Sequence, residues 1–114
     1  MGNTPRILKV YMDSRGKEPF IEWLESIKDQ KTRSRIVTRL DRFEVGNPGD
    51  FRPLSNGLFE LRLSFGPGYR IYYGEDDAVI VILLMGGDKD TQSADIKKAR
   101  SYWRMYKEEK NERL

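Results

Sequence analysis

The sequence predicts an α+β domain in which a mostly antiparallel four-stranded sheet packs its helices on one face, in the order β-α-α-β-β-β-α. Two segments before the middle of the chain carry apolar side chains at helical spacing, and a hairpin with alternating side chains follows them. An unbroken apolar run rich in Val and Ile then precedes one more helical pattern. With 114 residues, the chain is expected to form a single domain over residues 1–114, large enough to bury a modest core without disulfides or a metal.

The N-terminal half is predicted to contain one short strand and two helices. Residues 6–12 read as the strand, and a turn at residues 13–16 ends it. Pro19 suits a first helical turn, and the helix predicted over residues 19–28 has an apolar stripe of Phe20, Trp23, Leu24 and Ile27. The second helix is expected to point inward with Ile36, Val37, Leu40 and Phe43. Turn-forming residues at positions 46–50 end this helix, and a loop over residues 52–54 leads to the hairpin.

The hairpin over residues 58–73 separates its side chains onto two chemically different faces. If the Gly-Pro-Gly stretch at 66–68 is a three-residue turn, Ser64 pairs with Arg70 and Arg62 pairs with Tyr72. Strand alternation then directs one set toward the core, namely Leu61, Leu63, Phe65, Tyr69, Ile71 and Tyr73. The opposite face carries Glu60, Arg62, Ser64, Arg70 and Tyr72. The two arginines would lie at diagonal positions roughly 7–8 Å apart and repel each other unless an anion lies between or above them, for which we expect a polyanion.

The C-terminal part is predicted to be a buried strand followed by a helix. Residues 78–85 are continuously apolar, as expected of a central strand covered on both faces. The glycine-containing stretch at residues 86–90 ends the strand, and Thr91 or Asp90 can cap the final helix. One side of that helix is apolar, with Ile96, Ala99, Trp103 and Tyr106, and the other is basic, with Lys97, Lys98, Arg100 and Arg104.

Composition excludes several kinds of chemistry. The chain has no cysteine and no histidine, so disulfides, thiol nucleophiles, zinc-thiolate sites and histidine proton shuttles are absent. The sequence has neither an apolar run of about 18 residues nor a signal-peptide pattern, so we expect a soluble cytoplasmic protein without membrane association. The net charge of +3 mildly favours nucleic acid as a partner. Five cations are concentrated against Asp41 in the middle of the chain, namely Lys31, Arg33, Arg35, Arg39 and Arg42.

The basic residues of the hairpin and of the next strand end suit phosphate chemistry. Metal-free RNA cleavage drives a 2′-hydroxyl onto the neighbouring phosphate, and it needs a base, a cationic cradle and a proton donor. Arg70 and Arg62 can grip phosphate through their planar guanidinium groups, and Arg52 can reach in from the preceding loop. Lys89 follows the central strand, where the first N–H groups of a helix also favour an anion. We expect no metal and no cofactor.

Proton transfer and RNA contacts involve further candidates. Lys89 is the first candidate for moving protons, while Asp88 or Asp95 can act as a carboxylate base or orient that lysine. RNA contacts are assigned to Arg52, Arg39, Tyr72, which can stack on a base, and Gln92, which can bind a base edge.

These candidates have structural alternatives. Arg62 and Glu60 can form an ordinary surface ion pair, and a basic helix face can simply be solvated. Tyr72 can pack in the sheet, and Gln92 can occupy a first helical turn. Trp23 and Trp103 lie in apolar stripes, so packing in the core is the expected role of both.

Several short motifs occur in a fixed order within a stretch from about residue 20 to residue 103 that resembles a known family. They comprise Gly46-Asn47-Pro48-Gly49-Asp50, Leu54, Gly57, Glu60-Leu61-Arg62, Gly66-Pro67-Gly68-Tyr69-Arg70, Leu83-Leu84, Gly86-Gly87-Asp88-Lys89, Gln92 and Asp95-Ile96. Through these motifs and their order, the chain resembles the addiction-module killer branch of the RelE/ParE toxin superfamily, close to HigB-type toxins.

The resemblance implies a toxin of a type II toxin–antitoxin pair that cuts messenger RNA in the ribosomal A site when free. Its partner would be a cognate antitoxin, a helix-turn-helix DNA-binding protein from the neighbouring gene. Arg70 falls on the family's arginine in the Gly-Tyr-Arg motif, and Arg62 and Lys89 fall on basic positions. The family's catalytic tyrosine near the start of the last helix has no match, since Asp95 falls roughly there, so the general base stays open.

Two other activities are compatible with the same resemblance. ParE-like members of the superfamily keep the fold but inhibit DNA gyrase by binding. A degenerate module that binds only its antitoxin is the other alternative, because a fold does not fix a function.

Overall fold

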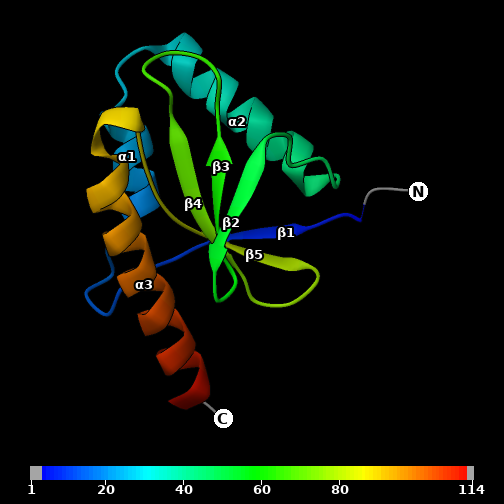
Figure 1. The fold of residues 1–114 in the computed structure, drawn as a ribbon, viewed down its shortest axis with the longest axis vertical. Helices are drawn as coiled ribbons and strands as arrows, with labels where there is room; N and C mark the ends of the chain where they lie inside the picture. Colours follow the sequence, from blue (N-terminus) through cyan, green and yellow to red (C-terminus); the bar gives the residue numbers. More distant parts are fainter. Residues whose placement is uncertain (1–3, 113–114) are drawn as a thin grey trace.

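The computed structural model describes residues 4–112, in which three α-helices surround one five-stranded mixed sheet (Figure 1). The strands are β1 (Ile7–Val10), β2 (Phe51–Ser55), β3 (Leu58–Arg62), β4 (Arg70–Glu75) and β5 (Ile80–Gly87). The helices are α1 (Pro19–Ser26), α2 (Gln30–Glu44) and α3 (Gln92–Glu112), and a 3₁₀ turn (Lys89–Thr91) leads directly into α3. The strand order β1-β5-β4-β3-β2 places β5, β4 and β3 inside the sheet. In this part of the chain, no helix is long and apolar enough to cross a membrane.

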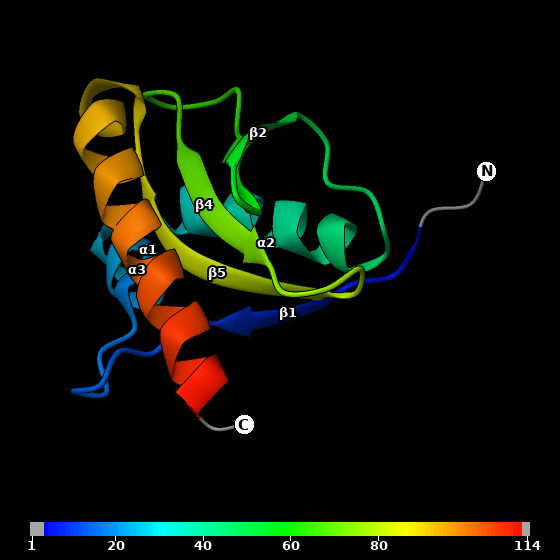
Figure 2. The ribbon, with the colours of Figure 1, turned by 60° about the horizontal axis from the view of Figure 1, so that its bottom comes forward.

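The helices cover both faces of the sheet, and the prediction of a single covered face was wrong. One face holds α1 and α2 over a core that includes Phe20, Ile36, Leu40, Phe43, Leu61, Ile71 and Leu83. The other face holds α3 over a core that includes Leu58, Tyr72, Ile82, Leu84, Ala99 and Trp103. Figure 2 shows α3 on the opposite side of the sheet from α1 and α2. Helical spacing reveals which side of a helix is apolar, but it does not reveal which sheet face that side contacts.

The predicted inward stripes are confirmed with one exception. Val37 is 44% exposed, because Ile36, Leu40 and Phe43 already define the buried side of α2. The unbroken apolar run of β5 is buried from both faces, as predicted, since alternate side chains of the strand belong to different cores.

The sheet has one strand more than predicted. The segment predicted as a loop forms β2, an edge strand antiparallel to β3. Proline is compatible with an edge position, so Pro53 does not interrupt the strand. At the other edge, β1 pairs parallel to β5, which makes the sheet mixed.

The β3–β4 hairpin differs from the predicted register by two residues. Arg62 lies directly opposite Arg70, and Glu60 lies opposite Tyr72. The connection is longer than a three-residue turn: the Leu63 N–H donates to the Tyr69 carbonyl at 3.0 Å, and the intervening turn has Gly66 and Gly68 in the left-handed region. A shift of two residues keeps each side chain on its predicted face, because the side-chain period of a strand is two.

Candidate functional site

The polar face of the hairpin lies beneath the start of α3, where five residues gather. We call this group the Arg70 corner and define it as Glu60 of β3, Arg70 of β4, Lys89 of the 3₁₀ turn, and Gln92 and Asp95 of α3. The sequence predicted that this face binds an external polyanion. In the structure, α3 covers much of it and leaves Glu60 fully buried.

Glu60 is the electrostatic centre of the corner. Its Oε1 accepts a hydrogen bond from Arg52 Nε at 3.1 Å, and its Oε2 accepts one from Gln92 Nε2 at 2.7 Å. Arg70 Nε lies 3.9 Å from the same Oε2. A buried carboxylate is tolerated only when it is paired and hydrogen-bonded, and here groups from β2, β4 and α3 supply this compensation.

Arg70 is nearly buried, but one edge of its guanidinium remains available. Its Nη1 donates to the carbonyls of Gly68 at 3.0 Å and Tyr69 at 3.3 Å. Among the described residues, Nη2 has no hydrogen-bond partner. The backbone therefore fixes the direction of the guanidinium while leaving donors for a ligand.

Lys89 lies next to Arg70 because Gly68 leaves space for both. A Cβ on Gly68 would lie 3.3 Å from Lys89 Cβ and 3.5 Å from Arg70 Nη1. Gly68 also has a φ of +80°, which an L side chain rarely adopts. The structure thus brings together two of the predicted site residues, and Lys89 is exposed beside the guanidinium.

Arg62 lies on the same sheet face as Arg70, but it has a different partner. Its Nε is 3.8 Å from Asp50 Oδ2, and its side chain is 43% exposed. The alternative of a surface pair between Arg62 and Glu60 is therefore wrong, since the two residues have separate partners. Carboxylates of the chain itself compensate the opposed arginines, so no external polyanion is needed to hold the hairpin together.

Two acidic residues around Lys89, Asp88 and Asp95, have structural partners. Asp88, rather than the predicted Thr91 or Asp90, caps the 3₁₀ turn, since its Oδ1 accepts from the N–H groups of Asp90 at 2.9 Å and Thr91 at 3.2 Å. Asp95 is 9% exposed, and its Oδ2 accepts a hydrogen bond from the Thr91 hydroxyl. A Cβ on the adjacent Gly87 would lie only 1.9 Å from that oxygen. Asp95 is thus held against the end of β5.

Tyr72 is buried beneath α3 and presents no ring face to a ligand. Its expected base-stacking role therefore finds no support in its position. Burial, followed by the negative charges of Glu60 and Asp95, raises the pKa of the Tyr72 hydroxyl well above its ordinary value. The hydroxyl stays protonated at neutral pH and is not a base.

Arg39 lies outside the corner, on α2. Its three guanidinium nitrogens donate to backbone carbonyls: Nε to Pro48 at 2.7 Å, Nη1 to Arg62 at 2.9 Å and Nη2 to Asp50 at 2.9 Å. Burial is the main cause that lowers the pKa of Arg39 from its ordinary value. The residue predicted to bind RNA thus joins α2 to the loop before β2.

Glu60 is the residue whose importance sequence reasoning missed. The pattern placed it on the polar face but treated it only as a surface partner of Arg62. The sequence does contain a signal for its burial. Glu60 lies between Leu58 and Leu61, and the strands that follow in the chain are rich in apolar and aromatic residues. That pattern indicates a buried sheet, in which a carboxylate needs cationic neighbours.

Two comparisons relate this chain to known proteins. Residues 22–107, which include every residue of the Arg70 corner, match the family model described as Phage derived protein Gp49-like (DUF891). An uncharacterized protein of Haemophilus influenzae is 44% identical over 81 residues, which covers 71% of this chain and 82% of that relative. The chain therefore belongs to the Gp49-like family of phage-derived proteins, a RelE-like family associated with toxin–antitoxin modules.

Proposed function

We propose that this protein is the toxin of a type II toxin–antitoxin module, of the HigB-like addiction-module killer branch, and that it cleaves messenger RNA on the ribosome when free. Family membership supports the toxin assignment. The observation that carries the nuclease assignment is the pairing of Arg70 and Lys89 across Gly68, with donors of Arg70 left open. Two adjacent cations of this kind suit a phosphate whose charge increases during reaction.

The proposed reaction breaks one phosphodiester bond without an added co-reactant. The 2′ oxygen forms a bond to phosphorus while the bond from phosphorus to the 5′ oxygen breaks, giving a cyclic phosphate and a free 5′-hydroxyl. Arg70 and Lys89 stabilise the negative charge of the phosphorane. The Asp95 carboxylate takes the proton of the 2′-hydroxyl, and the Lys89 ammonium donates one to the leaving oxygen. Glu60 orients Arg70 and does not touch the substrate.

The proposed partner is a cognate antitoxin made from a neighbouring gene, with a helix-turn-helix DNA-binding domain. Inhibition requires only that the antitoxin cover the open side of Arg70 and Lys89 or displace the start of α3. Displacement of α3 would disturb the site because Gln92, in the first turn of that helix, contributes directly to the site through its hydrogen bond to Glu60.

One observation favours a second candidate, a ParE-like inhibitor that binds DNA gyrase without cutting RNA. The two candidate carboxylates, Asp88 and Asp95, have structural partners: Asp88 caps a turn and Asp95 binds Thr91. A site whose carboxylates already accept hydrogen bonds within the chain is suited to binding a partner protein without any proton transfer.

Induction of the protein in bacterial cells tests both candidates. Transcripts are mapped by primer extension in cells that express the wild type, Arg70→Ala or Arg15→Ala, the last removing the same charge from the exposed turn before α1. The nuclease proposal expects cuts within codons for the wild type and Arg15→Ala, and none for Arg70→Ala. Growth arrest without new transcript ends, together with loss of gyrase supercoiling activity, would instead establish the gyrase inhibitor.

A further inference from the structure

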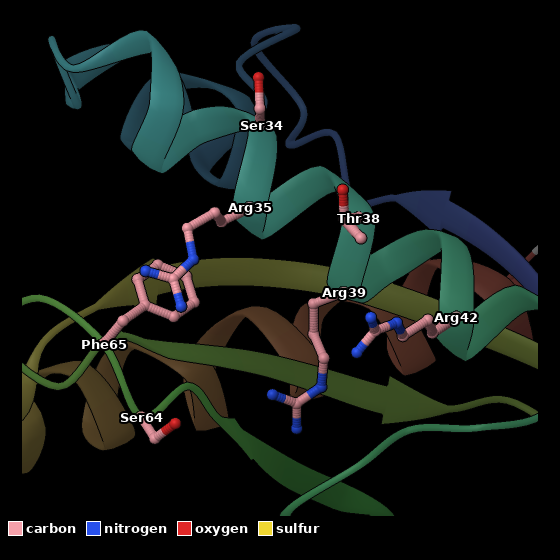
Figure 3. A pocket seen from close by; sticks show the side chains of 7 residues that line it. All are labelled: Ser34, Arg35, Thr38, Arg39, Arg42, Ser64 and Phe65. Carbon is pink, nitrogen blue, oxygen red and sulfur yellow. The ribbon is translucent and has the colours of Figure 1, made fainter.

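A basic groove lies along α2, away from the Arg70 corner. Its first part has a volume of about 350 Å³ and is lined by Arg35, Arg39 and Arg42 of α2 and by Ser64 and Phe65 of the β3–β4 turn (Figure 3). A second hollow of about 270 Å³ shares Arg39, Arg42 and Ser64 and adds Asp50 and Arg62. The shared residues make the two hollows one groove, which we call the α2 groove.

The arginines of the α2 groove are not equivalent. The guanidinium of Arg39 is occupied by three backbone carbonyls. Arg42 is exposed, and its side chain makes no hydrogen bond or ion pair within residues 4–112. Arg39 therefore builds the floor of the groove, whereas Arg42 is available to a ligand.

Arg35 is held in a flat orientation by an aromatic ring. Its guanidinium carbon lies 3.9 Å from the centre of the Phe65 ring, and Figure 3 shows the two groups stacked. This stack stabilises the cation while its N–H edge and outer face stay open. A guanidinium plane in this arrangement can hydrogen-bond a phosphate and also stack on a nucleobase.

The charge of the groove is strongly positive. Four arginines line it, and the acid that faces them among its lining residues is Asp50, which is ion-paired with Arg62. A concave surface with one sign of charge attracts ligands of the opposite charge. An anionic ligand with several charges fits this lining better than a single small anion.

Arg62 connects the α2 groove to the Arg70 corner. Its side chain lines the second hollow, and in the hairpin it lies directly opposite Arg70. Directly opposed residues of an antiparallel pair have Cα atoms about 5 Å apart. A chain-like anion that follows the groove to Arg62 is therefore one strand away from Arg70.

We propose that the α2 groove binds the phosphate backbone of single-stranded RNA flanking the phosphate held at Arg70. This inference deepens the proposed function and rests on it for the identity of the RNA. Arg42 binds one flanking phosphate, and Arg35 on Phe65 binds the next and stacks on its base. We favour RNA over an acidic protein segment because a carboxylate-bearing chain gains nothing from the open face of the Arg35–Phe65 stack.

Binding of two uncleavable probes tests the groove separately from cleavage. Fluorescence anisotropy is measured with a 2′-O-methyl RNA of 12 nucleotides and with one of three nucleotides, which is long enough for the corner alone. Arg42→Ala and Arg35→Ala are expected to bind the longer probe roughly fivefold more weakly and to lower its salt slope by about 0.7 for each phosphate that the variant no longer binds. They should bind the short probe as the wild type does. Arg15→Ala is the matched control and should bind both probes like the wild type, because its turn lies on the opposite side of the molecule from α2 (Figure 1).

Each result has a definite meaning. Full-strength binding of the longer probe by Arg42→Ala and Arg35→Ala would overturn the groove, even if the wild type cuts RNA. If the two variants bind the longer probe selectively more weakly while the wild type never cuts RNA, the groove would be supported and the nuclease proposal refuted. Polyglutamate that competes with the long probe as well as unlabelled RNA of equal charge would overturn the assignment to RNA and indicate an acidic protein. A wild type that binds neither probe would overturn the groove, whereas the nuclease proposal would still be decided by the transcript mapping, because the proposed cleavage takes place on the ribosome.

Discussion

The Glu60 carboxylate lies 3.9 Å from the Arg70 guanidinium, with Glu60 fully buried and Arg70 only 9% exposed. This carboxylate also binds Arg52 and the first turn of α3 through Gln92. One buried anion thus compensates the charge of the candidate catalytic arginine and also binds the helix that covers it.

Replacing Glu60 with Gln should destabilise the fold by about 3 kcal/mol, because the nearly buried Arg70 guanidinium would lose its compensating charge. Urea unfolding followed by circular dichroism measures the loss. Glu25→Gln, which changes the same side chain on the exposed side of α1, should stay within about 0.5 kcal/mol of the wild type. Equal stability of the two variants would show that the buried pair of Glu60 and Arg70 makes no net contribution to the free energy of unfolding.

Arg70→Ala and Lys89→Ala should each lower the rate of RNA cleavage about 10²- to 10³-fold, as expected for loss of one charge-stabilising group. Single-turnover cleavage of a ribosome-bound message measures the rate. The far-ultraviolet circular-dichroism spectrum of each variant is compared with that of the wild type, which separates a defect in chemistry from a defect in folding. Undiminished cleavage by either variant would remove that residue from the proposed site.

Arg39→Ala and Arg42→Ala should differ in their effect on stability, although the two residues lie one turn apart on α2. Arg39→Ala removes three hydrogen bonds to backbone carbonyls and should cost about 2–3 kcal/mol of stability. Arg42→Ala should leave the urea midpoint unchanged, since its side chain is exposed. A stable Arg39→Ala variant would contradict the structural role assigned to that side chain.

Stability should fall at alkaline pH because of two buried tyrosines. Burial is the main cause that raises the pKa of both Tyr72 and Tyr73 in the folded state. The stability that depends on their protonated form is complete below the unfolded pKa of about 10 and is lost as the pH rises above it. The urea midpoint should therefore begin to decline at about pH 10 and keep falling as the pH rises further, and it should fall less steeply in Tyr72→Phe. Identical pH profiles for the variant and the wild type would refute this linkage.

Gly74→Ala should destabilise the protein by about 1–3 kcal/mol, because a Cβ there would lie 2.3 Å from the Trp103 ring. The cost should shrink when Trp103 is replaced by Leu, and a double-mutant cycle in urea measures this coupling. Independent effects of the two substitutions would contradict the position of α3 on this face of the sheet.

Local sequence patterns determined the helices, the buried strand and the apolar side of each element. The predicted helix over residues 19–28 corresponds to α1, and the predicted strand over residues 78–85 corresponds to β5. The assignment of Arg62 and Arg70 to one face also held despite the wrong register, because alternation along a strand is independent of its partner. These properties depend on residues that are neighbours in the chain, so they can be read from the sequence.

The tertiary structure decided which segments meet. The parallel pairing of β1 with β5, the edge strand β2 and the placement of α3 opposite α1 and α2 all depend on partners far away in the chain. The role of Glu60 follows from the last of these: only when α3 covers its face does the carboxylate lose water and require Arg52 and Arg70. A periodic pattern shows that two residues share a face, but the cost of removing water from a charge depends on what finally covers that face.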